Sequence, residues 1–104
     1  MEKRKPSFDL ERIKSAFASI DDLNVTGSAV RSAAKLGFGR LEIVQTIQNM
    51  QRRQFIKSMT LYNNHRIWQD VYHVTSEAGM LYVKFTEGVI SEFLLLSFKE
   101  KDNE

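Results

Sequence analysis

The chain has 104 residues, of which 42% are hydrophobic and 11% aromatic, and its formal net charge is +2. We expect one domain over residues 1–104, because this length suits a single core and the composition is too apolar for a disordered chain. The absence of cysteine excludes disulfides, Cys-ligated zinc and thiol nucleophiles. No apolar run approaches the roughly 20 residues of a spanning helix, and no apolar signal region follows the charged start, so we expect a cytoplasmic protein.

The first part of the chain carries a helical pattern. Residues 1–6 are mostly charged, and we expect them to form a frayed basic arm. Ser7 or Asp9 can cap the helix that follows by accepting backbone N–H bonds. Apolar residues continue at helical spacing as far as Ile20, and the acidic pair at 21–22 is expected to end this helix.

Two more helices are predicted before the pattern changes. Thr26 can cap a second helix that extends to Lys35, and Gly37 stands where a left-handed C-terminal residue is favoured. A third helix fits residues 41–50, where apolar side chains recur at spacings of three and four. We expect helical character to continue or restart through residues 51–57.

Strand patterns fill the rest of the chain. Residues 62–65 have the composition of a turn. Strands are expected at residues 67–74 and 80–86, and one or two further strands within 89–99. Helices followed by a strand meander predict an α+β fold, in which N-terminal helices pack on a C-terminal antiparallel sheet.

Alternation in the predicted strands sorts the side chains between two faces. Residues i and i+2 of a strand point to the same face, so Tyr82 and Lys84 lie opposite Leu81 and Val83. The side chains expected beneath the helices are Leu81, Val83, Leu94, Leu96 and Phe98. Tyr82 and Lys99 then project from an outer face that is basic and aromatic, as platforms for single-stranded nucleic acid are. The pattern leaves open whether Lys84 and Lys99 are simply the solvated side of a half-exposed sheet.

Several other polar residues have two interpretations each. Arg52 and Arg53 fit either a solvated helix turn or a phosphate contact. His65 lies in a predicted turn, where its imidazole could carry a proton or simply be exposed. Asp70 suits a structural hydrogen-bond acceptor. Neither histidine has carboxylate partners at metal-ligand spacing and no Gly-rich phosphate loop is present, so we expect no metal site and no cofactor.

Five blocks of the sequence together resemble a known family. The two most specific are Lys57-Ser58-Met59-Thr60 and Ile67-Trp68-Gln69-Asp70-Val71-Tyr72. The others are the opening Met1-Glu2-Lys3-Arg4, the group Gly79, Tyr82 and Lys84, and the ending Ser97-Phe98-Lys99-Glu100-Lys101. With these blocks, nearly the whole chain resembles the MqsR family, the ribonuclease toxins of bacterial toxin–antitoxin pairs.

The resemblance implies a fold similar to that of the RelE-type toxins, and an mRNA endoribonuclease that cuts at motifs containing GCU and arrests growth. The functional residues of the family fall on matching types at Lys57, Gln69, Tyr82 and Lys99. We expect the ribose 2′-OH to attack the adjacent phosphate without a metal, giving a 2′,3′-cyclic phosphate, while Lys57 and Lys99 stabilise the phosphorane. Gln69 would orient the phosphate or read a base edge. Tyr82 would move a proton or stack a base, although a base role needs neighbouring lysines to lower its pKa; His65 is the reserve acid.

The resemblance also implies a partner, a dimeric antitoxin with a zinc-binding N-terminal part and a helix-turn-helix DNA-binding part. Zinc would then belong to the partner. The chain departs from the family pattern at His73-Val74, where a basic residue and a proline are expected, and in an acidic tail at residues 101–104. A second interpretation is a non-catalytic regulator that binds its antitoxin or nucleic acid and modulates transcription. Metal-independent RNA cleavage distinguishes the two.

Overall fold

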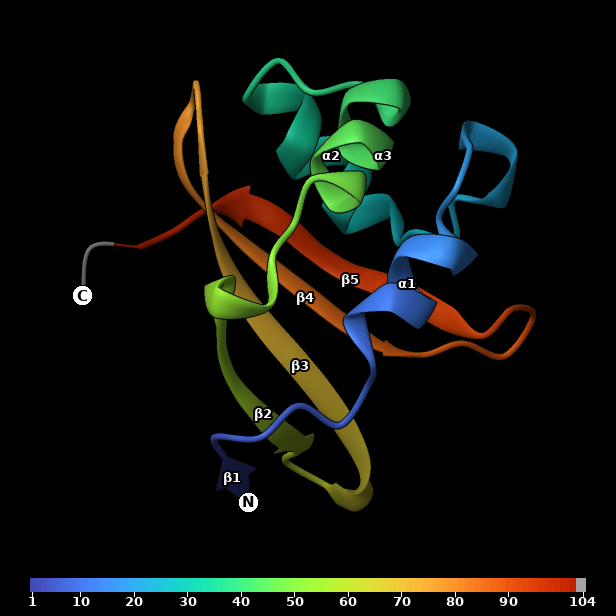
Figure 1. Ribbon diagram of the computed structural model, residues 1–104, viewed down its shortest axis with the longest axis vertical. Coiled ribbons are helices and arrows are strands. Elements are labelled where there is room, and N and C mark those ends of the chain that lie inside the picture. The colour runs from blue at the N-terminus through green and yellow to red at the C-terminus, as the bar shows by residue number, and fades with distance from the viewer. Residues whose placement is uncertain (103–104) are drawn as a thin grey trace.

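In this computed structural model, which describes residues 1–102, three helices lie in the chain between a short first strand and the four long strands of the sheet (Figure 1). The helices are α1 (Leu10–Ala16), α2 (Gly27–Lys35) and α3 (Arg40–Gln48), with 3₁₀ turns at Ile20–Asp22 and Arg52–Gln54. The strands are β1 (Glu2–Lys3), β2 (Phe55–Leu61), β3 (Asn64–Ser76), β4 (Gly79–Glu87) and β5 (Phe93–Glu100). They pair antiparallel in the order β1-β2-β3-β4-β5. The predicted α+β fold, helices packed on an antiparallel sheet as in RelE-like toxins, is confirmed.

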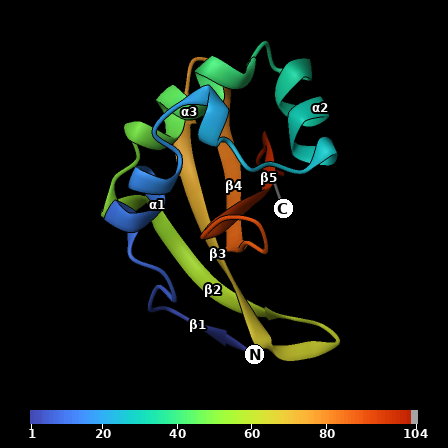
Figure 2. The same ribbon diagram turned by 90° about the vertical axis from the view of Figure 1, so that its right-hand side faces the viewer.

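The helices leave one face of the sheet uncovered. Helices α1 and α3 lie over one face, called the inner face here, and α2 runs beside the edge strand β5 (Figure 2). Hydroxyl groups of α2 and its cap satisfy carbonyls on that edge: Thr26 donates to Leu96 O at 3.1 Å and Ser32 donates to Phe98 O at 2.8 Å. The opposite face of the sheet is called the outer face. None of the helices within residues 1–102 has the length and apolarity to cross a membrane.

Capping residues set the start of two helices. Asp9 accepts the backbone N–H of Glu11 at the start of α1, and Thr26 accepts that of Ala29 at 3.1 Å at the start of α2. Helix α2 matches its predicted bounds. After it, Gly37 has a φ of 86°, a left-handed conformation that side chains with a Cβ rarely adopt.

The first helix is shorter than predicted. Helix α1 ends at Ala16, and Ile20 lies in a separate 3₁₀ turn where it is 44% exposed, so its predicted place on the apolar face was wrong. The core already receives Ile13 and Phe17 from this region, both without exposed surface. One more turn of helix would therefore have gained little burial.

Three further expectations differ from the structure. The arm at residues 1–6 is not frayed, because Glu2 and Lys3 pair as a strand with Met59 and Ser58 of β2. Helical character does not continue through residues 51–57: only a short 3₁₀ turn is present, and β2 begins at Phe55. The turn predicted at 62–65 is shorter than expected, since β3 already begins at Asn64.

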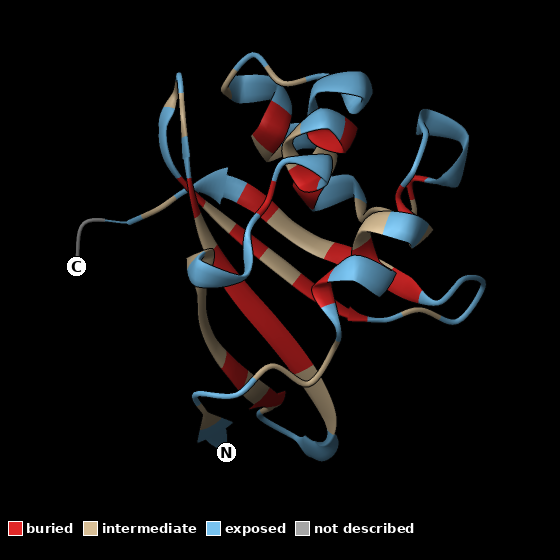
Figure 3. Ribbon diagram, viewed as in Figure 1, coloured by how far each residue is buried: buried red, intermediate tan, exposed pale blue. Residues whose placement is uncertain are grey.

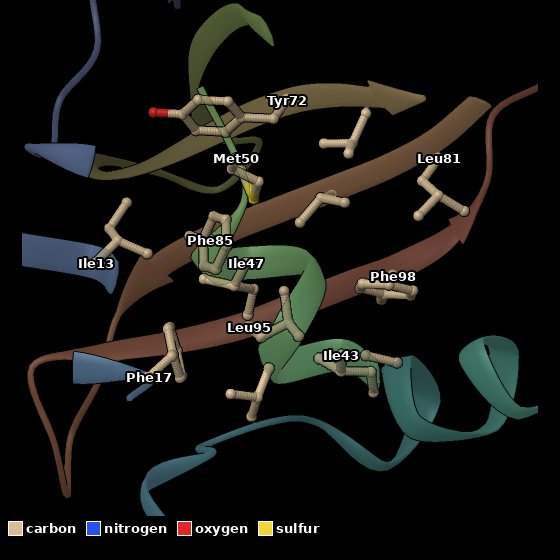
Figure 4. Packing of buried hydrophobic residues seen from close by; sticks show 14 of the residues in the cluster. Ile13, Phe17, Ile43, Ile47, Met50, Tyr72, Leu81, Phe85, Leu95 and Phe98 are labelled. Atoms are coloured by element: carbon tan, nitrogen blue, oxygen red, sulfur yellow. The ribbon is translucent and has the colours of Figure 1, made fainter. Parts of the chain in front are cut away.

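The core lies between the three helices and the inner face of the sheet, with Ala29 and Ala33 as the contribution of α2. Figure 3 shows the buried residues concentrated there, and Figure 4 shows their packing. Phe17 from the end of α1 packs against Phe85 of β4, with ring centroids 5.7 Å apart. The predicted inward positions Leu81, Val83 and Phe98 are fully buried. Alternation therefore fixed the orientation of β4 correctly.

A β-bulge changes the prediction for β5. Between Lys84 and Phe85 the pairing with β5 skips one residue, so Leu96 has no partner and the alternation shifts. Leu95 is consequently buried in the core, whereas Leu94 and Leu96 are only half-buried. The expectation that Leu94 and Leu96 pack under the helices was wrong for this reason.

Candidate functional site

The pairing register brings polar side chains of four strands into rows across the outer face. One row runs Lys57, Val71, Lys84 and Ser97, from β2 to β5. The next row contains His73, Tyr82 and Lys99, and the row on the other side contains Met59, Gln69 and Thr86. Paired side chains lie roughly 4.5–5.5 Å apart at their Cβ atoms. Segments that are distant in sequence therefore form one continuous surface, called the lysine face here.

The lysine face is more densely packed than a solvated sheet surface. Val71 has no exposed surface although it points away from the helices. Its paired neighbours on the two adjacent strands are Lys57 and Lys84, and long cationic side chains commonly lay their aliphatic stems over apolar surface. Gln69 is 5% exposed and Thr86 7%. The charged groups are therefore held over a buried floor.

Positive charges converge on Tyr82. The Nζ atom of Lys99 lies 5.3 Å from the centre of the Tyr82 ring, and that of Lys84 lies 5.9 Å away. Burial, together with the nearby charges of Lys99 and Lys57, lowers the pKa of Lys84 below its ordinary value. Such an ammonium group gives up its proton more readily than a free lysine.

Tyr82 does not have the lowered pKa that a base role would require. Burial raises the pKa of its hydroxyl above the ordinary value. The phenol therefore remains protonated at neutral pH, and it can donate a hydrogen bond or offer its ring for stacking.

A carboxylate from the first strand reaches the edge of this surface. Glu2 Oε1 lies 3.3 Å from Lys57 Nζ, while a second contact joins Glu2 to Arg4 at 3.6 Å. About a third of the Lys57 side chain is exposed, at 31%. Glu2 thus occupies part of the position where a phosphate would meet Lys57.

His73 belongs to the lysine face, although the sequence did not single it out as a site residue. Its ring lies 6.0 Å from that of Tyr82, centroid to centroid. A pocket of about 310 Å³ is lined by His73, Tyr82, Lys99, Lys101 and Asp102. Burial, with the charges of Lys101 and Lys57, lowers the pKa of His73. The signal that could have found it is its parity: it follows Gln69 by four residues on one strand and so shares its face.

The chain matches a known protein family over most of its length. The family described as "Motility quorum-sensing regulator, toxin of MqsA" matches residues 5–100. The chain belongs to this toxin family. The resemblance noted in the sequence is therefore confirmed. The chain is also 39% identical over 101 residues to the mRNA interferase toxin MqsR of Escherichia coli (strain K12), covering 97% of this chain and 100% of the relative.

In this member of the toxin family, the remaining candidates lie away from the lysine face. His65 is exposed at the start of β3, eight residues before His73, which is roughly 26 Å along a strand. Arg52 lies with its guanidinium 5.0 Å from the ring of Phe55, a residue that packs against the core. Arg53 donates to Gln51 at 2.6 Å. Thus Lys57, Gln69, Tyr82, Lys84 and Lys99 are brought together, and these three are not.

The structure also shows the surroundings of Asp70, of the possible metal ligands and of the acidic tail. Asp70 points to the inner face and accepts backbone N–H bonds, so its structural role is confirmed. Across the described residues, no three His, Asp or Glu side chains are grouped closely enough to hold a metal ion. In the predicted acidic tail, residues 103–104 lie outside the described residues, and Lys101 and Asp102 line the His73 pocket.

Proposed function

We propose that this chain is the toxin of a toxin–antitoxin pair and acts as an mRNA endoribonuclease that arrests growth. Membership of the family supports the toxin assignment, and the name of the Escherichia coli relative, an mRNA interferase, supports the activity. The observation that carries the proposal is the lysine face, where Lys84 and Lys99 stand beside Tyr82 and Lys57 lies across Val71 from Lys84. Ammonium groups beside an aromatic ring suit a phosphate next to a stacked base.

In the proposed reaction, the ribose 2′-oxygen attacks the adjacent phosphorus and the bond to the 5′-oxygen breaks. Lys57 and Lys99 stabilise the charge that develops on the phosphorane oxygens, because they are held in place before the reaction begins. The products are a 2′,3′-cyclic phosphate and a free 5′-OH. Since the protein supplies this charge itself, we propose that the reaction needs no metal ion.

Other members of the lysine face have supporting roles in the proposal. Gln69, almost fully buried beside the floor of the face, orients the phosphate or reads a base edge. Lys84 donates a proton to the leaving 5′-oxygen, a role that its lowered pKa favours. Tyr82 stacks on a base or donates a hydrogen bond. We propose motifs containing GCU as the cleavage sites, in keeping with the family resemblance.

We also propose that a cognate antitoxin binds and inhibits the chain. The family description names MqsA as the partner of its toxins. The antitoxin expected from the resemblance is dimeric, with a zinc-binding part and a helix-turn-helix DNA-binding part. A gene for such a protein beside this one would support the proposal, and purification of a stable complex of the two chains tests it.

Cleavage of a defined RNA in excess EDTA tests the activity. Lys57→Ala is compared with wild type and with Lys35→Ala, which removes an exposed lysine of α2. We expect Lys57→Ala to lower the cleavage rate by about 100- to 1000-fold, the range for loss of one preorganised donor. The Lys35→Ala variant should cut as wild type does.

The result that contradicts the proposal is equally specific. If folded wild-type protein leaves a GCU-containing RNA intact, with and without ribosomes, the chain is a regulator that binds its partner or nucleic acid without chemistry. If folded Lys57→Ala cuts at the wild-type rate, the reaction does not occur at the lysine face.

A further inference from the structure

The lysine face lacks an assigned group to receive the proton of the attacking 2′-OH. The lysines are cationic at neutral pH, and burial holds the Tyr82 phenol in its protonated form by raising its pKa. Gln69 does not titrate. Apart from the carboxylates at its margin, Glu2 and Asp102, an imidazole is the side chain among the described residues of this surface that can take up a proton near neutral pH.

His73 is the histidine that the fold brings to this surface. It pairs directly with Tyr82, which in turn pairs with Lys99, so the three side chains form one row. It is half-buried and opens onto the pocket of about 310 Å³ that Tyr82 and Lys99 also line. The chain has one other histidine, His65, and it is exposed at the far end of β3.

We propose that His73 is the general base of the cleavage reaction. Its imidazole takes the proton of the 2′-OH as the 2′-oxygen bonds to phosphorus. The bond from phosphorus to the 5′-oxygen breaks, and that oxygen leaves with a proton from Lys84. No electron is transferred and no co-reactant is needed. The inference rests on the proposed ribonuclease function and names the residue that starts it.

The charges around His73 favour this role. The groups that face it are Lys57 from β2, Tyr82 from β4, and Lys99, Lys101 and Asp102 from β5 and the residues after it. Four of these five are cationic or uncharged at neutral pH, and burial acts in the same direction as the cations. The pKa of His73 is therefore lowered, and the ring is neutral and able to accept a proton at pH 7. By contrast, an imidazole surrounded by carboxylates would have a raised pKa, would be protonated and would act as an acid.

The pH dependence of kcat/KM tests the proposal. Wild-type protein should lose activity as the pH falls below the pKa of His73, because the protonated ring accepts no proton. His73→Asn should lower kcat by about 100-fold or more, which is the lower end of the effect of a general base, and should remove this acid limb. Binding of an RNA with a 2′-O-methyl group at the cleaved position should change little, because Asn preserves the polar surface.

Two matched controls accompany this variant. Thr75→Asn places the same side chain two residues further along β3, on the same face and outside the pocket, and should keep the wild-type rate and profile. His65→Asn tests the competing assignment, in which His65 is the general base. A third protein, His73→Ala, should regain activity on addition of free imidazole, which a purely structural histidine would not do.

The outcomes separate this inference from the proposed function. Cleavage by His73→Asn with an unchanged acid limb overturns the assignment and leaves the ribonuclease in place. Loss of the acid limb in His65→Asn instead of His73→Asn also overturns it. If wild-type protein cuts no RNA at any pH, both the proposed function and this assignment are wrong.

Discussion

The buried carboxylate of Asp70 makes a strong prediction about stability. Asp70 has no exposed surface, and its oxygens accept the backbone N–H of Ser7 at 3.1 and 3.0 Å and that of Phe8 at 3.0 Å. Beside it, the hydroxyl groups of Ser7 and Ser58 lie 2.7 Å apart. These bonds tie the segment before α1 to the centre of the sheet, so their loss should loosen the helix as well.

The size of the effect follows from the number of donors. Asp70→Ala leaves two backbone N–H groups without their acceptor, and each such loss costs about 1–2 kcal/mol at a partly buried site. The expected total is about 2–4 kcal/mol, a large part of the roughly 5–15 kcal/mol that a small domain has. The melting temperature should fall by roughly 10–25 °C. Asp70→Asn keeps one acceptor oxygen and should cost about half as much.

Urea unfolding followed by circular dichroism measures this difference. Asp9→Asn is the matched control: Asp9 also accepts a backbone N–H near α1, but at 3.4 Å and on the surface, and asparagine is an equally good helix cap. The control should therefore stay within about 0.5 kcal/mol of wild type. An Asp70→Ala protein that is equally close to wild type would refute the reasoning, since the buried bonds would then contribute nothing.

Two further predictions concern Tyr72 and Glu2. The Tyr72 hydroxyl is buried, points away from the apolar cluster in Figure 4 and has no hydrogen-bond partner among the described residues, so Tyr72→Phe should raise the free energy of unfolding by about 1 kcal/mol. Burial and nearby Asp70 raise the pKa of Tyr72 to about 12, whereas the tyrosine of the unfolded chain ionises at lower pH. The free energy of unfolding of wild type should therefore fall between pH 10 and 12, and that of Tyr72→Phe should fall less. Equal losses for the two proteins, measured by urea titration at both pH values, would contradict this. Glu2→Gln removes the carboxylate beside Lys57 and should strengthen binding of a non-cleavable RNA by about 1.5- to 5-fold at low salt, measured by fluorescence polarisation. Unchanged or weaker binding would show that Glu2 does not compete with phosphate.

The sequence predicts the sheet correctly where hydrophobic residues alternate with polar ones and the hydrophobic ones are buried. In β4, hydrophobic inward positions alternate with Tyr82 and Lys84, and the pattern fixed both faces correctly. The strand β2 was missed because its inward positions are polar: Ser58 contacts the hydroxyl of Ser7, and Thr60 is also buried. Without hydrophobic alternation, the sequence 51–57 looked helical.

Other features depend on distant parts of the chain. The first strand forms because Glu2 and Lys3 pair with β2, which lies more than fifty residues later in the chain. The bulge that moves Leu96 out of register leaves no local signature, such as a glycine, in β5. At the site, the resemblance supplied Lys57 and Gln69, and strand parity places His73 on the face of Gln69, but its grouping with Lys57, Tyr82 and Lys99 depends on the register of four strands.

The most direct test of the central claim uses two RNAs that differ at one atom. Both contain a single GCU motif, and one lacks the 2′-OH at the nucleotide 5′ to the cleaved bond. In excess EDTA, wild-type protein should cut the all-ribose RNA, leaving a 2′,3′-cyclic phosphate and a 5′-OH, and should leave the deoxy-substituted RNA intact at that position. Cutting of both RNAs at the same bond, or cutting that appears only when a divalent metal ion is restored, would contradict the account.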